Sequence, residues 1–194
     1  YLYVSFYKRF NAFFDYDNDN DLDCFIINNS FIPTNTLNYE NKRNLRAKDW
    51  PVKDFLKGGG DRLMKNNNGI FEDVSEQAGV YGSLISFGLG VTVGDINNDG
   101  WQDIYVCASG PVEPGKRKNL LYINNRDLTF TEMAAAYGLD DSSYSTQAVF
   151  LDYDKDGRLD MYLLTHQMQG ENINKVLPKD LSGNSPRNDQ LYHN

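Results

Sequence analysis

The nine residues DINNDGWQD, residues 95–103, decide how this sequence is organised, because their pattern occurs twice more. The other copies are DYDNDNDLD, residues 15–23, and DYDKDGRLD, residues 152–160. Carboxylates this close together repel one another, so chain folding alone would not favour them. A cation bound among them would neutralise the charge, and any account of the sequence must explain three such loops.

The composition of the 194 residues favours strands and turns over helices. Aromatic residues make up 13% of the chain, 16 residues are glycine, and the hydrophobic content of 40% suffices for a packed core. The net charge of −8 disfavours nucleic acid as a partner. No apolar run approaches the ~20 residues of a membrane span, and the first ten residues do not resemble a signal peptide.

The segments around the loops repeat as well. Each loop precedes an apolar run (CFII, IYVC or MYLL), which is followed after a gap by RLMKNN, LLYINN or QLYHN. An asparagine near the end of the later segment recurs at Asn66, Asn124 and Asn194. We expect short helical turns at residues 75–78 and 132–137. In the middle unit the pattern predicts four strands, at residues 87–94, 104–108, 120–124 and 128–133.

Four short strands in each unit, at the period of propeller repeats, predict an all-β fold built of β-propeller blades with four antiparallel strands. Residues 1–194 would then form a partial propeller of three repeats, with long insertions at residues 28–60 and 166–190 and a shorter one at 109–119. Three blades are too few to close a propeller, so we expect further blades from the same chain or a partner chain. Cys24 and Cys107 align with apolar positions of other units and are predicted to be buried and reduced.

The loops carry oxygen side chains at positions 1, 3, 5 and 9, and a carbonyl at position 7 could turn inward. Oxygen ligands in a flexible loop suit Ca²⁺, about three ions in all, better than Mg²⁺. Zinc is disfavoured by the expectation that no His or Cys reaches these loops. The candidate metal ligands are Asp15, Asp17, Asp19, Asp21 and Asp23 in the first loop; Asp95, Asn97, Asp99, Trp101 and Asp103 in the second; and Asp152, Asp154, Asp156, Arg158 and Asp160 in the third.

Two other interpretations of the loops were weighed. An EF-hand loop starts in the same way but requires Glu at position 12, where this chain has Ile26, Val106 and Leu163. An acidic, solvated turn would explain one copy, but three copies in register favour a metal site. Position 6 is Gly100 or Gly157, and Asn20 in the first loop, as a turn with positive φ requires.

The stretch FGLGVTVGDINNDGWQDIYVCASGP, residues 87–111, resembles an FG-GAP repeat, with its leading Phe-Gly and its DxNxDGxxD loop. The other units resemble the related VCBS-type repeats, so the resemblance covers nearly the whole chain. It implies an integrin-α-like propeller, usually seven-bladed, with Ca²⁺ in the loop between the first two strands of a blade. The first unit departs from the pattern, because Asn20 replaces Gly, Asp21 is an extra acid and a clear Phe-Gly is missing.

The insertions all fall between the second and third strands of their blades, so we expect them on the face opposite the acidic loops. In integrin-like propellers that face binds ligands, and two insertions are net basic, which favours an anionic ligand. Trp50 is open to two interpretations, since it would either contact a ligand or fasten its insertion to the blade. The candidate ligand-binding residues are Trp50, Lys116, Arg117 and Lys118.

The function that this pattern favours is a calcium-stabilised module that binds proteins or glycans, as in adhesion. The chain has only two histidines, His166 and His193, and no nucleophile motif such as G-x-S-x-G, so we expect no enzymatic activity. An accessory role beside a glycan-degrading or other secreted enzyme and a purely structural spacer remain as alternatives. Weak calcium sites fill at millimolar Ca²⁺, which favours an extracytoplasmic location: secreted, cell surface or periplasmic.

Overall fold

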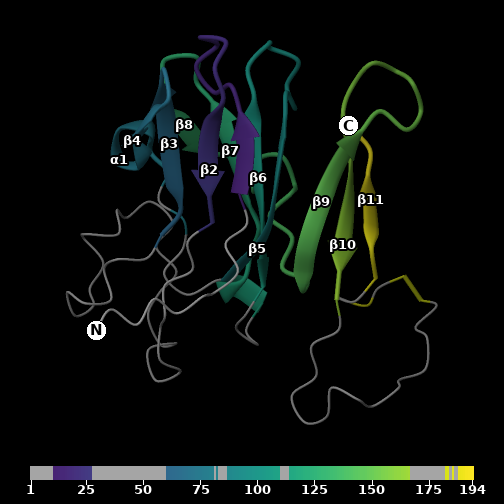
Figure 1. Cartoon of the computed structure of the whole chain (residues 1–194). Helices are drawn as coiled ribbons and strands as arrows, with labels where there is room; N and C mark the ends of the chain where they lie inside the picture. Colours follow the sequence, from purple (N-terminus) through teal and green to yellow (C-terminus); the bar gives the residue numbers. More distant parts are fainter. Residues whose placement is uncertain are drawn as a thin grey trace, which may run out of the picture.

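The computed structural model of the chain describes residues 11–27, 60–80, 82, 87–109, 114–166, 182–183, 185 and 188–194. This part is all-β and contains three antiparallel sheets of four, four and three strands (Figure 1). We name the sheets blades 1, 2 and 3 in chain order. The prediction of an all-β fold with four-stranded antiparallel units is confirmed for blades 1 and 2, and three strands of blade 3 are described.

Within each blade, strands that are consecutive in the chain pair side by side. Blade 1 contains β1 (Asn11–Phe14), β2 (Asp23–Ile26), β3 (Arg62–Asn67) and β4 (Ile70–Asp73), followed by α1 (Ser75–Ala78). Blade 2 contains β5 (Phe87–Gly94), β6 (Asp103–Ser109), the 3-10 turn η4 (Pro114–Lys116), β7 (Leu120–Asn124) and β8 (Phe130–Glu132). Blade 3 contains β9 (Ser145–Leu151), β10 (Asp160–Thr165) and β11 (Gln190–Tyr192).

The strands predicted for the middle unit match β5 and β7 at both ends, and β6 is one residue longer at each end. The fourth strand is shorter than predicted, because Leu128 has a φ of 70° and belongs to the turn before β8. The helical turn at residues 75–78 is confirmed as α1. Residues 134–138 form only a turn, in which the Tyr137 N–H donates to the Met133 carbonyl at 3.1 Å.

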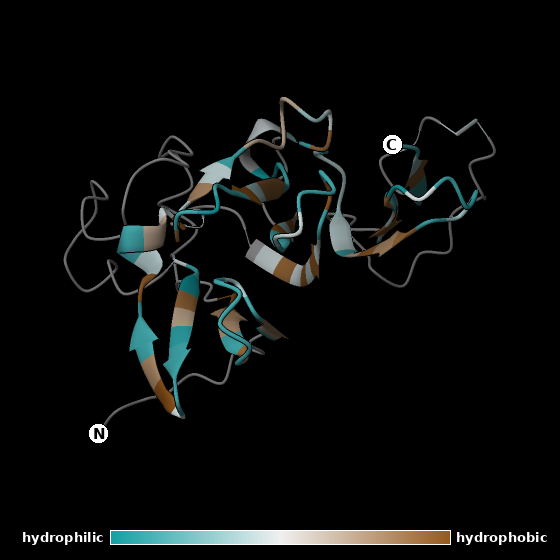
Figure 2. Cartoon of the chain, turned by 90° about the horizontal axis from the view of Figure 1, so that it is seen from above, coloured by the Kyte–Doolittle hydropathy of each residue, from teal (hydrophilic) through white to brown (hydrophobic). Residues whose placement is uncertain are grey.

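The core lies between neighbouring blades rather than within one blade. Side chains of β6 alternate, so that Ile104 and Val106 join the cluster shared with blade 1 while Tyr105 and Cys107 join the cluster shared with blade 3. All seven residues of β6 are buried, as expected of a strand covered on both faces. In the view from above, the three sheets stand side by side, with hydrophobic residues along the strands and hydrophilic residues in the loops (Figure 2).

Two glycines of β5 allow the blades to approach closely. A Cβ on Gly88 would lie 2.6 Å from Ile27 Cγ2 of blade 1, and a Cβ on Gly90 would lie 2.3 Å from the Thr146 carbonyl oxygen of blade 3. Blade 2 therefore packs tightly on both neighbours because these positions have no side chain.

Both cysteines are free and buried, as predicted, and burial raises the pKa of each thiol. Among the described residues no helix is long and apolar enough to cross a membrane.

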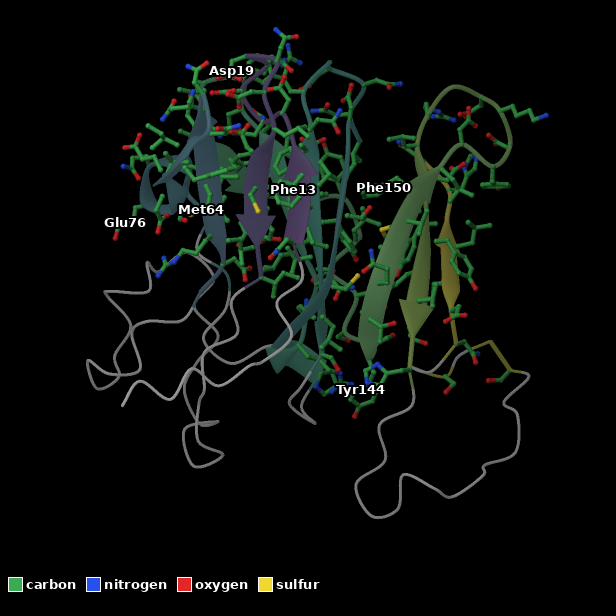
Figure 3. All side chains as sticks on the ribbon, viewed as in Figure 1. Phe13, Asp19, Met64, Glu76, Tyr144 and Phe150 are labelled. Carbon is green, nitrogen blue, oxygen red and sulfur yellow. The ribbon has the colours of Figure 1, made fainter. Side chains whose placement is uncertain are left out.

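The connections between strands leave opposite ends of the blades. In blade 1, Phe14 pairs with Asp23 at the acidic-loop end, and Ile26 pairs with Arg62 at the other end, where the chain enters the insertion at residues 28–60. Figure 3 shows the same polarity, with Asp19 at the loop end and Tyr144 at the opposite end. The insertions themselves, including nearly all of 28–60 and most of 166–190, lie outside the described residues.

Candidate metal-binding loops

The first aspartate of each loop folds the loop rather than projecting freely. In the second loop, Asp95 Oδ1 accepts the Asp99 N–H and Asp95 Oδ2 accepts the Gly100 N–H, both at 2.8 Å. The same pair of bonds, from positions 5 and 6, reaches Asp15 and Asp152 in the other loops. One carboxylate at position 1 therefore closes each turn.

Positive φ angles occur at two positions of every loop. Position 6 was predicted to need one, and its φ is 71° at Asn20, 87° at Gly100 and 89° at Gly157. Position 4 was not predicted, although its φ is 58° in the first two loops and 66° at Lys155. Asparagine occupies position 4 in those two loops (Asn18 and Asn98), and its tolerance of this conformation was the available signal.

The last aspartate of each loop fastens the loop to the third strand of its blade. Asp103 is fully buried, its Oδ2 accepts the Ile96 N–H and its Oδ1 accepts the Asn124 N–H, both at 2.9 Å. Asp23 and Asp160 make the equivalent bonds with position 2 of their loops and with the recurring asparagine. Position 9 thus has a structural role that the candidate ligand list did not anticipate.

The recurring asparagine also joins neighbouring blades. Asn124 donates its amide to the Tyr16 carbonyl of the blade 1 loop at 2.9 Å, and Asn194 donates to the Ile96 carbonyl of the blade 2 loop at 3.4 Å. Position 4 adds a second link, because the Asn98 amide donates to the Gly157 carbonyl at 3.2 Å. Successive acidic loops are therefore hydrogen-bonded to one another.

Carboxylate oxygens at positions 1, 3 and 5 gather in the first loop. Asp15, Asp17 and Asp19 each offer an oxygen, and these atoms lie within 4.8 Å of one another. The Asp17 side chain is only 3% exposed, and its Oδ1 has no hydrogen-bond partner within the part of the chain that the structure describes. A buried carboxylate oxygen without a donor is costly, so this group of oxygens could hold a cation beside Lys65, which pairs with the other Asp17 oxygen.

The other two loops differ in their donors. In the second loop the amide Asn97 replaces a carboxylate at position 3 and donates to Asp99 Oδ2 at 2.8 Å. In the third loop, Asp152, Asp154 and Asp160 form a group within 4.8 Å. At position 7, the backbone N–H of Asp21, Trp101 or Arg158 donates to the position 5 carboxylate, which fixes that side chain.

Basic side chains surround the carboxylates. Lys65 contacts Asp17 and Asp19, Arg126 lies 3.0 Å from Asp99, and Arg158 contacts Asp156. The expectation that no histidine reaches the loops is wrong, because His193 Nε2 lies 2.9 Å from Asp154 Oδ2. The cause is strand register: His193 precedes the recurring asparagine as Lys65 does in blade 1, and this position faces position 3 of the loop.

The pKa values of the loop carboxylates are shifted in different directions. Burial raises the pKa of Asp103 to about 6 and also raises that of Asp23, although backbone N–H groups oppose the shift. Burial also acts against ionisation of Asp99, but hydrogen bonds from Trp101, Asn97 and Arg126 together lower its pKa. The Arg158 guanidinium lowers the pKa of the exposed Asp156.

The residues present fit a hard divalent cation. The side-chain donors in the first two loops are carboxylate and amide oxygens, which suit Ca²⁺, and position 1 holds the turn in shape. His193 adds a nitrogen donor to Asp154 and Asp156 in the third loop, so this loop offers a mixed donor set.

Two of the four candidate ligand-binding residues, Arg117 and Lys118, lie at the opposite end of the sheets. Arg117 is buried and its guanidinium stands 4.1 Å from the centre of the Tyr144 ring, while Lys118 pairs with Asp140. Arg117 therefore packs within the structure instead of projecting into solvent. Trp50 and the side chain of Lys116 lie outside the described residues.

Comparison with known proteins identifies one family. The model of the FG-GAP-like repeat matches residues 108–163, a span that runs from the end of β6 through β7, β8 and β9 and includes the third acidic loop. No curated protein matched the chain significantly. Residues 108–163 are therefore an FG-GAP-like repeat, the kind of repeat that forms propeller blades.

Proposed function

We propose that the three acidic loops bind Ca²⁺ and that the ions stabilise a propeller segment. The observation that carries this proposal is the buried Asp17 Oδ1, which has no donor among the described residues and lies beside two further carboxylates. The side chains at positions 1, 3 and 5 would hold the ion, and the position 9 carboxylate would hold the loop on the third strand of its blade. The bound ion supplies positive charge, and the chain's own hydrogen bonds shape the loop.

The effect on stability follows from mass action. A site at 100-fold saturation adds about 2.7 kcal/mol if the unfolded chain does not bind, which corresponds to roughly 5–10 °C in Tm for a chain of this size. We expect Ca²⁺ to raise Tm and EGTA to reverse the rise. Because the loops are bonded to one another through Asn98 and Asn124, stabilisation should extend across blade boundaries.

Calorimetric Ca²⁺ titration and thermal unfolding with EGTA test the proposal. Asp17→Asn should remove the stabilisation that Ca²⁺ provides at the first site, and Asp156→Ala should do the same at the third. Glu72→Gln, an exposed acid on β4, is the matched control and should leave calcium binding unchanged. An identical Tm in EGTA and in millimolar Ca²⁺ would refute a stabilising role for the ion.

We further propose that the end of the blades opposite the acidic loops binds a protein or glycan of anionic character, in an extracytoplasmic, non-enzymatic setting. The support is the placement of Lys118, which pairs with Asp140 and precedes β7 at the end of the strand away from the acidic loops. Heparin can serve as the probe. Lys118→Glu should weaken heparin binding, whereas Lys155→Glu, on the acidic-loop end, should weaken it less. Equal losses would contradict the assignment of the binding face.

Exposed apolar side chains on one face of blade 3 are evidence for a further blade. Tyr162, Leu164 and Leu191 are between 37% and 53% exposed, and their equivalents in blade 2 pack against blade 3. We propose that another blade, of the same or a partner chain, covers them. Leu164→Lys should therefore reduce binding of a hydrophobic dye without lowering Tm, and undiminished dye binding would argue against an open apolar face here.

A further inference from the structure

The residue before the recurring asparagine differs in chemistry among the three blades. It is Lys65 in blade 1, Ile123 in blade 2 and His193 in blade 3. In blade 1 the Lys65 ammonium pairs with Asp17, at position 3 of the loop, and lies 3.6 Å from Asp19, at position 5. An ammonium group only donates hydrogen bonds, so it adds positive charge beside these oxygens but cannot bind an ion itself.

In blade 3 the same position brings a nitrogen ligand to positions 3 and 5 of the loop. The Nε2 atom of His193 lies 2.9 Å from Asp154 Oδ2, and ligand atoms of His193, Asp154 and Asp156 all lie within 4.8 Å of one another. A tetrahedral zinc ion with ligands at ~2.1 Å separates neighbouring donor atoms by about 3.4 Å. Small side-chain rotations would therefore let these three groups share one ion.

The backbone on both sides of His193 is fixed to the rest of the blade. Tyr192 pairs with β10, and the Asn194 N–H donates to Asp160 Oδ1 at 3.0 Å. The imidazole also stands edge-on to the Tyr153 ring, with centroids 5.9 Å apart. These contacts hold the imidazole beside the loop without any ion, so His193 would lose little conformational freedom on binding one.

We propose that the third loop is a site for a borderline divalent cation of the Zn²⁺ class, held by Asp154, Asp156 and His193. This inference rests on the proposal that the acidic loops bind cations, and it adds that the third loop prefers a different ion. Imidazole nitrogen suits Zn²⁺, whereas Ca²⁺ takes oxygen ligands. The side chains of Asp154 and His193 are 34% and 51% exposed, so water can complete the coordination of the ion.

Arg158 competes with an ion for one of these carboxylates. Its guanidinium donates to Asp156 Oδ2 from both Nε and a terminal nitrogen. The Arg158 side chain is 51% exposed, and an exposed ion pair adds little to stability, so the guanidinium can turn into water when an ion binds Asp156. In blade 1, by contrast, Lys65 pairs with an Asp17 side chain that is only 3% exposed, so its charge stays beside the loop.

Calorimetric titrations of the chain with ZnCl₂ and with CaCl₂ test the proposal. We expect His193→Gln to weaken Zn²⁺ binding by about tenfold or more, because a ligand is lost, and to change Ca²⁺ binding by less than about twofold. His166→Gln, at the other end of β10, is the matched control and should leave the binding of both ions unchanged. In NMR spectra of the unaltered chain, Zn²⁺ should shift the imidazole resonances of His193 and leave those of His166 in place.

The two titrations separate this inference from the calcium proposal. Equal Zn²⁺ affinity with and without His193 would overturn the inference, and so would an equal loss of both ions, because the substitution would then have disturbed the loop as a whole. Normal Ca²⁺ binding without Zn²⁺ binding would overturn the inference alone, whereas a chain that binds neither ion would overturn both. Zn²⁺ binding that depends on His193 in a chain that does not bind Ca²⁺ would support this site and refute the calcium proposal.

Discussion

Replacing Asn124 with alanine should destabilise the chain mainly by weakening the contact between blades 1 and 2. Asn124 is 2% exposed and donates to the Tyr16 carbonyl at 2.9 Å and to the Gln102 carbonyl at 3.4 Å, while its Oδ1 accepts the Arg126 N–H at 2.9 Å. The substitution removes these bonds and leaves the Tyr16 carbonyl without a donor in a buried position. We expect a loss of roughly 2–4 kcal/mol in the free energy of unfolding.

Asn66 is the matched control, because it has the same role at the open side of blade 1. Its amide donates to Leu22 of its own loop and its Oδ1 accepts the Gly69 N–H, but no described blade precedes it. Asn66→Ala should therefore cost less, and the difference from Asn124→Ala, about 1–3 kcal/mol, isolates the bond to Tyr16. Asn125→Ala, at an exposed neighbour, should change stability by less than about 0.5 kcal/mol.

Urea unfolding in EGTA and in Ca²⁺ measures these differences, with the slope m compared among the variants. The Asn124 effect should persist in EGTA, because the bonds join backbone and amide groups and need no ion. Equal losses for Asn66→Ala and Asn124→Ala would refute the inference that the amide links the blades. A loss that disappears in EGTA would assign the effect to metal binding instead.

Two further predictions concern charge and packing. In EGTA, the pKa of Asp103 is raised to about 6, against 3.8 for an ordinary aspartate, so the folded state binds more protons than the unfolded state between these values. The contribution of Asp103 to stability therefore falls as pH rises through this window. Asp103→Asn should abolish this pH-dependent loss, measured by urea unfolding at pH 4 and pH 7. Gly90→Ala should lower stability by roughly 1–3 kcal/mol through the clash with the Thr146 carbonyl, whereas Gly115→Ala, which meets open space, should be nearly neutral by thermal unfolding.

Repetition made most of the fold predictable. A single apolar run such as IYVC is ambiguous, but three runs in register after three acidic loops restrict the alternatives to a repeated four-strand unit. The limits of β5 and β7 follow from flanking Gly and Asn residues. The fourth strand was overestimated because the positive φ of Leu128, a residue with no preference for that conformation, arises from the tight turn before Phe130.

The loop details that were missed depend on distant partners. The role of position 9 requires the Asn124 N–H, 21 residues from Asp103, and the role of the asparagine amide requires Tyr16, 108 residues away. The recurrence of Asn66, Asn124 and Asn194 was visible in the sequence, but no local rule connects an asparagine at a strand end to a carbonyl in the preceding blade. His193 was misjudged for the same reason.

The aspartates of one loop therefore have two different roles: some hold the backbone of the loop, and others supply carboxylates for a cation. Asp95 and Asp103 satisfy backbone N–H groups within their blade, and a carboxylate does so without any ion. At position 3, Asp17 Oδ1 has no partner among the described residues, whereas the position 5 carboxylates accept the position 7 N–H. The carboxylates at positions 1, 3 and 5 repel one another when no cation is present. Removal of the ion should then strain the loop tips, positions 3 to 5, while the bonds made by positions 1 and 9 remain. Since the tips carry the Asn98 link to Gly157, the first consequence should be loosening between blades, with each four-stranded sheet still intact.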